Sequence, residues 1–466
     1  MRVKIPRIVI AGTHSGVGKT SVAIGLMASL KKKGFKVQPF KVGPDYIDPT
    51  YHTLASERKS RNIDGWMMGK DVLLKVFING SMDADICVVE GVMGLFDGYD
   101  GMSEAGSTAE VAKILKAPVI LVVDAGKMAR SVAALVKGYV EFDEDIDIEG
   151  IILNNIGSNK HYEMVKSAIE ENLDLKVLGY LPRDEKLGIS ERHLGLMAPH
   201  DNFNVCETVK LIAKSTEKFL DIDSIISVAQ RALPVEAISF NPSAKKLARC
   251  QAMGENVRLA VAMDEVFFFY YPENLELIES FGVEIVPFSP INNLTLPQNF
   301  HGIYIGGGYP ELFGEELEKN RTMRKMLRTA IENNVPTYAE CGGLMYLAKM
   351  LIDSDGKAYE MVGALPAEAR MNSKLTSLGY VNIDVISDNL LARKGERLKG
   401  HEFRWSDIEF SGEIVKTYLT KTKKECGLEG YASKNLLASY IHLHFSAKPQ
   451  VVERFVMKMK KFKEEH

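Results

Sequence analysis

The chain has 466 residues, of which 46% are apolar and 26% are charged, and its formal net charge is −3. This composition is typical of folded proteins of two or three domains. Basic residues cluster only at residues 458–463, which argues against a nucleic-acid-binding surface. No apolar run is long enough to span a membrane. The five cysteines are scattered and form no C-x-x-C pair, so they predict neither a disulfide framework nor a zinc site, and we expect a protein of the reducing cytoplasm.

A glycine-rich loop, AGTHSGVGKT at residues 11–20, follows a short apolar strand and precedes a helical pattern. Strand, glycine loop and helix together are the context of a phosphate-binding P-loop, in which backbone N–H groups face phosphate oxygens. The expected ATP-binding residues are Gly16, Gly18, Lys19 and Thr20. Lys19 would reach the outer phosphates, and the Thr20 hydroxyl would bind Mg²⁺.

The spacing of this loop departs from the usual G-x-x-x-x-G-K-[ST] pattern, because its first glycine is Gly12 and position 13 is Thr. The loop is therefore a variant P-loop. An ATPase switch of the ParA/MinD type is one alternative function for such a loop. Those switches carry a signature lysine five residues before the P-loop lysine, and here that residue is His14.

The first half of the chain alternates continuous apolar strands with helix-length segments. The expected strands are residues 8–10, 37–42, 85–89, 118–123, 148–153 and 177–181. Such strands predict a doubly wound, mostly parallel α/β sheet, covered on both faces, with ligands bound at the carboxyl ends of the strands. Polar residues at those ends include Glu90, Asp124 and Asn154.

Residues 41–49 contain two prolines and a glycine, which we interpret as excluding regular structure. Asp45 and Asp48 would then lie on a rigid loop near the phosphates, in a metal or substrate role, or as capping groups of the turn. Tyr46 between them is a candidate substrate contact. Glu90 ends a buried strand, where nucleotide enzymes place a carboxylate that holds Mg²⁺.

A second glycine-rich segment, Gly91–Gly98, reads as a mobile loop that carries one more acid, Asp97. Ser107 and Thr108 are expected to open a helix, and they are candidate substrate contacts because a helix N-terminus suits an anionic group.

The first domain is expected to cover residues 1–235, followed by a linker at 236–256 and a second domain at 257–466. Helices are expected at residues 211–220 and 221–233. The second domain begins again with strands at 258–263, 283–288, 302–305 and 336–339, and a helix at 271–281. This alternation predicts a second α/β domain.

Residues 336–343, PTYAECGG, combine a strand, Cys341 and two glycines before a helical run at 344–351. This is the pattern of a nucleophile elbow, a sharp strand-to-helix turn that presents a nucleophile. Gly307 and Gly308, in a glycine loop that follows another strand, are candidates for an oxyanion hole. His442 and His444 are expected on one face of a strand, and Cys341 with His442 forms a candidate catalytic pair.

Taken together, these residues resemble the cobyrinic acid a,c-diamide synthase family, which includes the nickel-sirohydrochlorin a,c-diamide synthases. The resemblance covers about residues 7–448. The N-terminal half looks like dethiobiotin synthetase, and the C-terminal half looks like a class I glutamine amidotransferase of the cobyric-acid-synthase type. The motifs that carry it lie at residues 41–49, 89–98, 306–311, 340–343 and 400–403.

The resemblance implies ATP-dependent amidation of acetate carboxylates on a tetrapyrrole macrocycle, with glutamine as the nitrogen donor and an acyl phosphate as the intermediate. The cofactors implied are ATP and Mg²⁺. The implied roles are nucleophile for Cys341, base for His442, Mg²⁺ ligands for Thr20, Asp45 and Glu90, acyl-phosphate chemistry for Asp48 and Asp97, and recognition of the nucleobase for Asn154.

Two positions depart from the family pattern. Class I amidotransferases usually follow the catalytic histidine with Pro-Glu, but Leu443 and His444 stand here, which leaves the third triad member open. Arg404 and Trp405 stand where His-Tyr is expected. Two alternative functions stay open, a cobyric acid synthase and a binding protein with an inactive amidotransferase domain. The sequence also leaves open which macrocycle is the substrate and whether the chain forms a homodimer.

Overall fold

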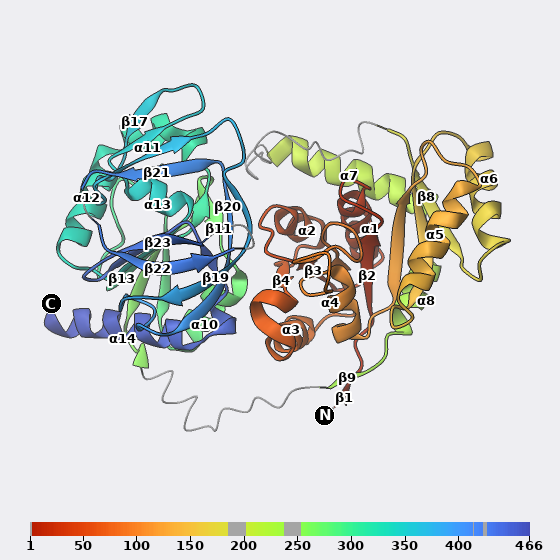
Figure 1. Cartoon of the computed structure of the whole chain (residues 1–466), viewed down its shortest axis with the longest axis horizontal. Helices are drawn as coiled ribbons and strands as arrows, with labels where there is room; N and C mark the ends of the chain where they lie inside the picture. Colours follow the sequence, from red (N-terminus) through yellow and green to blue (C-terminus); the bar gives the residue numbers. More distant parts are fainter. Residues whose placement is uncertain (1, 185–201, 237–252, 413, 423–425) are drawn as a thin grey trace. The chain divides into compact units, whose positions relative to one another are not determined.

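The computed structural model describes residues 2–184, 202–236, 253–412, 414–422 and 426–466 (Figure 1). These residues fall into two compact units, one within Met1–Ser239 and the other within Phe240–His466. Most of the linker expected at 236–256 lies outside the described residues. Each unit is an α/β structure, as predicted.

The first unit is built on a parallel sheet of seven strands. Their order is β4 (Arg61–Ile63), β3 (Val37–Val42), β5 (Ile86–Glu90), β2 (Arg7–Gly12), β6 (Val119–Asp124), β7 (Ile148–Ile156) and β8 (Val177–Pro182). Every residue of β2, β3 and β5 is buried, so these central strands are covered on both faces. This confirms the sheet that the continuous apolar runs predict.

Eight helices accompany this sheet in the described residues. They are α1 (Lys19–Lys32), α2 (Asp48–Ser56), α3 (Gly65–Ser81), α4 (Thr108–Leu115), α5 (Ser131–Phe142), α6 (Asn159–Glu170), α7 (Asn202–Phe219) and α8 (Ile222–Gln230). Gly25 allows α1 to approach α7 closely, because an added Cβ would lie 2.0 Å from Oγ1 of Thr216. A short antiparallel pair joins β1 (Arg2–Val3) and β9 (Val235–Glu236).

The second unit contains a ten-stranded mixed sheet. Its order is β12 (Glu284–Phe288), β10 (Arg258–Ala262), β13 (Gly302–Ile305), β15 (Thr337–Glu340), β24 (Leu436–Ser439), β23 (Cys426–Ser433), β22 (Lys416–Lys421), β19 (Ser377–Val385), β20 (Arg397–Arg404) and β25 (His442–Leu443). The first five strands are parallel, and the rest pair antiparallel. The parallel strands confirm the predicted α/β arrangement.

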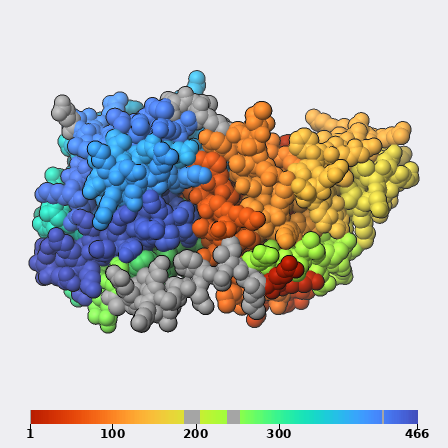
Figure 2. Space-filling model, turned by 60° about the horizontal axis from the view of Figure 1, so that its bottom comes forward, coloured from red at the N-terminus to blue at the C-terminus, as the bar shows by residue number. Residues whose placement is uncertain are grey.

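Smaller elements complete this unit. A four-stranded sheet has the order β17 (Ala358–Glu360), β16 (Met350–Ile352), β18 (Ala367–Met371) and β21 (Ser406–Phe410), and β11 (Phe267–Phe269) pairs with β14 (Gly307–Gly308). The helices are α10 (Pro272–Ser280), α11 (Gly314–Lys319), α12 (Arg321–Glu332), α13 (Gly342–Leu347) and α14 (Gln450–Glu465), with 3₁₀ turns at Pro310–Phe313 and Phe445–Ala447. Helix α14, dark blue in Figure 2, lies at the surface and buries Val452, Phe455, Val456 and Met459 against the unit.

The ten-stranded sheet curls back on itself. Only Tyr440 and Ile441 separate β24 from β25, yet β24 pairs with β15 and β25 pairs with β20, five positions further along the sheet. The return brings His442 and Leu443 to Glu340 at the end of β15. The end of β15 and β25 therefore meet, although about 100 residues separate them in the sequence.

Three local predictions are wrong. The helix after Cys341 ends at Leu347, and residues 350–352 form β16 instead of continuing to Leu351. Regular structure is not excluded from residues 41–49, because α2 begins at Asp48 with Pro49 in its first turn, where a missing N–H costs no hydrogen bond. His442 and His444 do not share a strand, since β25 ends at Leu443.

Among the described residues, no helix has both the length and the apolar character needed to cross a lipid bilayer. The four cysteines within these residues, Cys87, Cys206, Cys341 and Cys426, are all free thiols. The prediction of no disulfide framework therefore holds for this part of the chain.

Candidate functional site

The phosphate loop in the first unit runs from the end of β2 to the start of α1. Gly16 and Gly18 have φ angles of 78° and 98°, in the left-handed region that favours glycine. Gly18 also needs to be small, because an added Cβ would lie 2.2 Å from Nδ2 of Asn154. That amide donates a hydrogen bond of 2.9 Å to the carbonyl of Val17. Asn154, the predicted base-reading residue, therefore contacts the phosphate loop directly.

Lys19 is the first residue of α1, and its ammonium folds back onto the loop, donating to the carbonyl of His14 at 3.2 Å. Burial and the neighbouring Lys41 ammonium lower the pKa of Lys19 to about 8, although Glu90, Asp48 and Asp97 counteract them. An ammonium that has lost part of its hydration gains more from an anionic partner than a solvated one does. Lys19 is thus placed to receive a phosphate.

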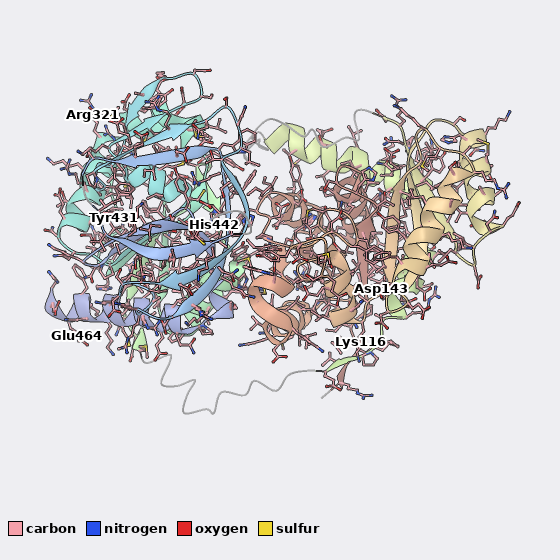
Figure 3. All side chains as sticks on the ribbon, viewed as in Figure 1. Lys116, Asp143, Arg321, Tyr431, His442 and Glu464 are labelled. Carbon is pink, nitrogen blue, oxygen red and sulfur yellow. The ribbon has the colours of Figure 1, made fainter. Side chains whose placement is uncertain are left out.

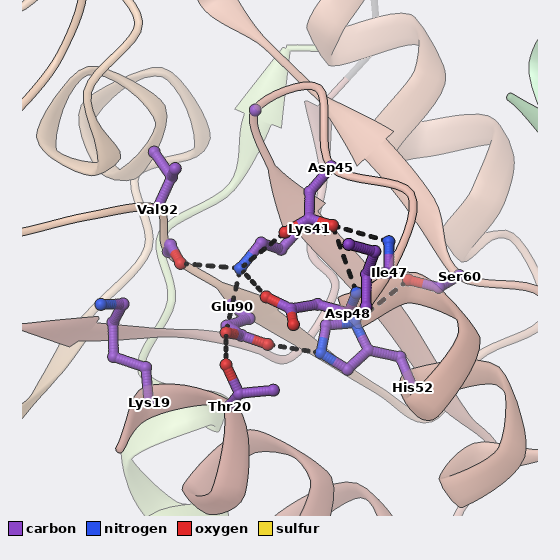
Figure 4. A network of polar contacts seen from close by, with 12 residues as sticks. Lys19, Thr20, Lys41, Asp45, Ile47, Asp48, His52, Ser60, Glu90 and Val92 are labelled. Atoms are coloured by element: carbon purple, nitrogen blue, oxygen red, sulfur yellow. Dashed lines mark hydrogen bonds and ion pairs between the residues drawn. The ribbon is translucent and has the colours of Figure 1, made fainter. Parts of the chain in front are cut away.

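A buried ammonium, Lys41 Nζ, forms the centre of the polar cluster at the ends of β3 and β5 (Figure 4). It lies 2.5 Å from Oδ2 of Asp48, 3.0 Å from Oε1 of Glu90 and 3.9 Å from Oδ2 of Asp45. It also donates to the carbonyl of Gly91 at 3.3 Å. Burial alone would lower the pKa of Lys41, but the three carboxylates raise it above its ordinary value. Lys41 therefore stays charged and holds these acids together.

Glu90 is fully buried and uses both oxygens. Oε1 accepts from the Thr20 hydroxyl at 2.6 Å and from Lys41, and Oε2 lies 2.5 Å from Nε2 of His52. Burial would raise the pKa of Glu90, but Lys41 and the hydrogen bonds from His52 and Thr20 hold it well below its usual value. Glu90 is therefore an ionised carboxylate in direct contact with the phosphate loop.

The two aspartates of residues 41–49 have different surroundings. Asp45 Oδ1 accepts from the backbone N–H groups of Ile47 and Asp48 at 2.7 and 3.2 Å, which is the capping interaction of an Asx turn. Asp48 caps nothing and faces Lys41. Burial and the charges of Asp45 and Glu90 raise its pKa, and Lys41 counteracts this. Tyr46 between them is half-buried.

The donor set next to the phosphate loop fits Mg²⁺. Thr20 and Glu90 present adjacent hard oxygens there, and Mg²⁺ in nucleotide sites is typically held by one or two carboxylates and by phosphates. Asp45 lies on the other side of the Lys41 ammonium. Within the described part of the chain, no group of three or more His, Cys, Asp or Glu side chains is arranged to hold a metal ion. Thr20 and Glu90 are thus the better supported of the three predicted ligands.

The other predicted residues of this unit lie in two places. Asp97 is exposed, accepts from the Gly94 N–H at 2.9 Å, and is close enough to raise the pKa of Lys19. Ser107 and Thr108 are completely buried. Ser107 caps α4, and Thr108 exchanges two hydrogen bonds with the backbone of Val92. These two hydroxyls hold the chain and do not face an open site.

Next to the phosphate loop, a cavity of about 440 Å³ opens at the ends of β6 and β7. It is lined by His14, Asp124, Gly126, Lys127, Met128, Asn155 and Arg183. Asp124 accepts from the Gly126 N–H at 2.8 Å and from the Asn155 amide at 2.9 Å. Since His14 belongs to the phosphate loop and Asn155 follows Asn154, this cavity adjoins the phosphate loop on the side of Asn154.

The second site lies at the end of β15, where the predicted sharp turn is present. Cys341 has φ 48° and ψ −106°, an unusual conformation for a residue with a side chain. Gly343 lies so close to β13 that an added Cβ would be 2.4 Å from the carbonyl of Ile305. Cys341 is 8% exposed, and its thiol lies 3.9 Å from the carbonyl of Phe403 on β20. Phe403, the last residue of the 400–403 motif, therefore contacts the thiol.

His442 is buried within the second unit, whereas Arg321 and Glu464 lie at its periphery (Figure 3). The Cys341 thiol lies close enough to the imidazole to help raise the pKa of His442. Burial lowers the pKa of His442, but the bonds to Cys341 and Glu340 outweigh it and raise the pKa to about 10. The predicted pair is thus brought together. His444 points elsewhere, with its ring 4.8 Å from Tyr271 and its Nε2 3.7 Å from Glu273.

The two predicted oxyanion glycines lie beside this pair. An added Cβ on Gly307 would be 2.6 Å from Cε1 of His442. Gly308 has φ 155°, and an added Cβ would overlap the carbonyl of Val266. Backbone atoms of Gly308 also lie about 3 Å from the Cβ position of Gly342, next to the nucleophile. Only glycine fits at these contacts, so the backbone approaches His442 and Gly342 closely.

Sequence reasoning missed three residues that hold these sites together, namely Lys41, His52 and Glu340. A lysine in the last two residues of a predicted buried strand, shortly before two aspartates, is a signal for Lys41. Nothing local identifies His52, since its partner Glu90 is 38 residues away.

Both halves of the chain match known domain families. Residues 8–196 match the family described as CobQ/CobB/MinD/ParA nucleotide binding domain, and residues 258–450 match the CobB/CobQ-like glutamine amidotransferase domain. The first description includes the MinD and ParA switches, so the second match is what distinguishes the chain from them.

Curated relatives extend over nearly the whole chain. A cobyrinate a,c-diamide synthase of Caldanaerobacter subterraneus subsp. tengcongensis is 42% identical over 97% of this chain and 98% of the relative. Proteins of the same name are 43% identical in Dehalococcoides mccartyi, over 99% of both chains, and 42% identical in Priestia megaterium, over 98% of both. The resemblance predicted from the motifs is confirmed, and the chain belongs to the cobyrinate a,c-diamide synthase family.

Proposed function

We propose that this chain amidates the a and c acetate carboxylates of a cobyrinate-type macrocycle, using glutamine as nitrogen donor and ATP to activate each carboxylate. The observation that carries the proposal is the presence, in one chain, of a buried Cys341–His442 pair and of a phosphate loop bordered by Lys19, Lys41 and Glu90. The full-length relatives support the choice of macrocycle.

In the glutaminase reaction, the Cys341 sulfur attacks the side-chain amide carbon of glutamine. The C–N bond breaks, a thioester forms, and His442 gives its proton to the leaving ammonia. Water then hydrolyses the thioester to glutamate. The N–H groups of Gly307 and Gly308 are proposed to stabilise the negative oxygen of the tetrahedral intermediate.

In the synthetase reaction, the acetate oxygen takes the γ-phosphoryl group of ATP and releases ADP. Ammonia then attacks the acyl carbon, phosphate leaves, and an amide remains. Lys19 and the loop amides are proposed to hold the phosphates, and Asp48 is proposed to accept the proton that ammonia loses. Mg²⁺, held by Thr20 and Glu90 with Asp45 nearby, would neutralise phosphate charge. The Gly91–Gly98 segment, with Asp97, is proposed to shield the acyl phosphate from water.

The test is a mass-spectrometric amidation assay on cobyrinate and nickel-sirohydrochlorin in parallel, because both carry a and c acetates. Each macrocycle is incubated with ATP and Mg²⁺, and with either glutamine or ammonium. We expect two amides on cobyrinate with either nitrogen source. Amidation of nickel-sirohydrochlorin alone would reassign the macrocycle, and no amide on either one would refute the proposal.

A further inference from the structure

His442 needs a third partner if it is to act as a base, because an imidazole in a catalytic pair works best when its second nitrogen is fixed. The position two residues after His442 is His444, which faces Tyr271 and Glu273 instead. The carboxylate next to His442 comes from another place in the chain. Glu340 Oε2 lies 3.3 Å from Nδ1 of His442.

We propose that Glu340, the residue immediately before the nucleophile, is the positioning residue that orients His442 toward Cys341. The proposal rests on the glutaminase function proposed above. Glu340 does not touch the reacting atoms. It acts by fixing which nitrogen of His442 faces the thiol and by stabilising the imidazolium that forms when the thiol gives up its proton.

The backbone explains how two neighbouring residues reach one imidazole. Consecutive side chains on a strand point to opposite faces. Glu340 ends β15, and Cys341 then takes the left-handed conformation with φ 48°. This turn removes the alternation, so that the carboxylate and the thiol both contact His442. The strained conformation of Cys341 therefore has a use beyond exposing the sulfur.

The carboxylate of Glu340 is itself held firmly. It is 1% exposed, and Oε1 accepts from the Tyr338 hydroxyl at 2.6 Å and from the Leu443 N–H at 3.3 Å. Oε2 accepts from the Tyr304 hydroxyl at 3.3 Å. Three donors on different strands fix the carboxylate, as a group that orients a base requires.

The charges around His442 and Glu340 agree with this role. Burial and the Glu340 charge raise the pKa of Tyr304 and Tyr338 well above 10. The pKa values of Tyr270 and Tyr418 are raised as well. All four phenol groups therefore stay neutral. His401, paired with His442 across β20 and β25, has its pKa lowered to about 3 by burial and by His442, so it stays neutral. Among these neighbours, Glu340 is the anion that can balance the imidazolium.

The test uses the full chain carrying Glu340→Gln, which keeps the size of the side chain and removes its charge. Glutamate release is measured with ATP and cobyrinate present, and the rate of iodoacetamide alkylation at Cys341 is measured against pH. We expect kcat for glutamine to fall by about 10²-fold or more. We expect the alkylation midpoint to move to higher pH, because a less stable imidazolium favours the thiolate less.

The matched control is Glu429→Gln. Glu429 is a half-buried carboxylate, and it accepts from the Ser439 hydroxyl at 2.6 Å and the Tyr440 N–H at 2.8 Å, next to the same chain segment. This variant should keep the wild-type alkylation profile. Glu340→Asp, which keeps the charge, should keep the wild-type midpoint with a reduced kcat, and it serves as the test if Glu340→Gln fails to fold.

Amidation from ammonium separates the two proposals. Glu340→Gln should retain it at the wild-type rate, as a check on folding and on the synthetase. If Cys341→Ala abolishes glutaminase activity but Glu340→Gln keeps wild-type kcat and an unshifted midpoint, the role of Glu340 is refuted and the proposed function stands. If Cys341→Ala keeps its glutaminase activity, the proposed function fails first.

Discussion

The Nε2 atom of His52 on α2 lies 2.5 Å from Oε2 of Glu90 at the end of β5, and both side chains are fully buried. On its other side the His52 ring lies 3.3 Å from the Ser60 hydroxyl. Helix α2 is thereby joined to the strand that carries the carboxylate at the phosphate loop. Asp48 begins the same helix. A shift of α2 would therefore move Asp48 directly and Glu90 through its contact with His52.

Replacing Lys41 with Met should destabilise the fold by about 3–5 kcal/mol at neutral pH, because it leaves buried carboxylates without their counter-charge. The measurement is urea unfolding. Lys113→Met is the control, since Lys113 pairs with Glu104 and Asp143 near the surface, and exposed pairs contribute about 1 kcal/mol or less. A loss for Lys41→Met no larger than that of the control would contradict the central role of Lys41.

The same variant should show a distinct pH dependence. The folded-state pKa of Glu90 is lowered, so its contribution to stability is present above the unfolded pKa of about 4.3 and is lost as pH falls through the folded value. The folded-state pKa of Lys41 is raised, so its contribution is lost only as pH rises above about 10. The difference between wild type and Lys41→Met should therefore be largest from about pH 5 to 9 and shrink only as the pH falls below about 4. A difference that grows on acidification would be evidence against this assignment.

Lys19→Ala should lower amidation by about 10²–10³-fold or more with glutamine and with ammonium alike, because both reactions need the charge at the phosphates. Lys19 is at the start of α1, and its ammonium donates to the carbonyl of His14 in the phosphate loop, so the free energy of unfolding in urea should change little. Near-normal rates with ammonium would remove the assigned role in ATP use.

Asp45 and Asp48 should separate when each is changed to Asn. Asp45→Asn keeps the Oδ1 acceptor of the turn but removes the negative charge, and we expect weaker use of ATP and Mg²⁺. Asp48→Asn removes the proposed proton acceptor, so acyl phosphate should still form and be hydrolysed by water. The measurement is phosphate released per amide formed, which should rise well above one for Asp48→Asn. A ratio that stays at one would leave Asp48 a structural partner of Lys41.

Cys341→Ala should abolish amidation from glutamine and retain amidation from ammonium, since the thiol and the phosphate loop belong to separate units. Mass spectrometry of the macrocycle with each nitrogen source gives the answer. A variant that is inactive with ammonium, yet folded by circular dichroism, would show that the two reactions are not separable.

The sequence predicted the parts of the fold that depend on continuous patterns. Strands such as β5 and β6 are apolar up to a final acidic residue and are flanked by helix-length segments, so their place in a parallel sheet follows from burial. The glycine-rich turns that contain Gly18 and Cys341 were also predictable, because few residue types accept the backbone conformations that such turns need.

The residues that support the sites were not predictable in the same way. Strand alternation places Glu340 and Cys341 on opposite faces, and only the turn at Cys341 reverses this. His444 was expected beside His442 for the same reason, but β25 ends after two residues and the chain enters a 3₁₀ turn. Lys41 and Glu90 meet through strand pairing across 49 residues, which no local pattern encodes.

The return of β25 to the end of β15 has a consequence for how the glutaminase site forms during folding. Asn274 on α10 bonds to the backbone of Phe445, 171 residues later, and Glu340 bonds to His442 across 102 residues. Contacts this distant in sequence form slowly, because long stretches of chain must be ordered first. During refolding, alkylation of Cys341 should acquire its native pH dependence only after the strands β19 to β25 have closed. Among the interactions of the second unit, the catalytic pair is then one of the last to appear, and truncating the chain before β25 would leave a thiol without its base.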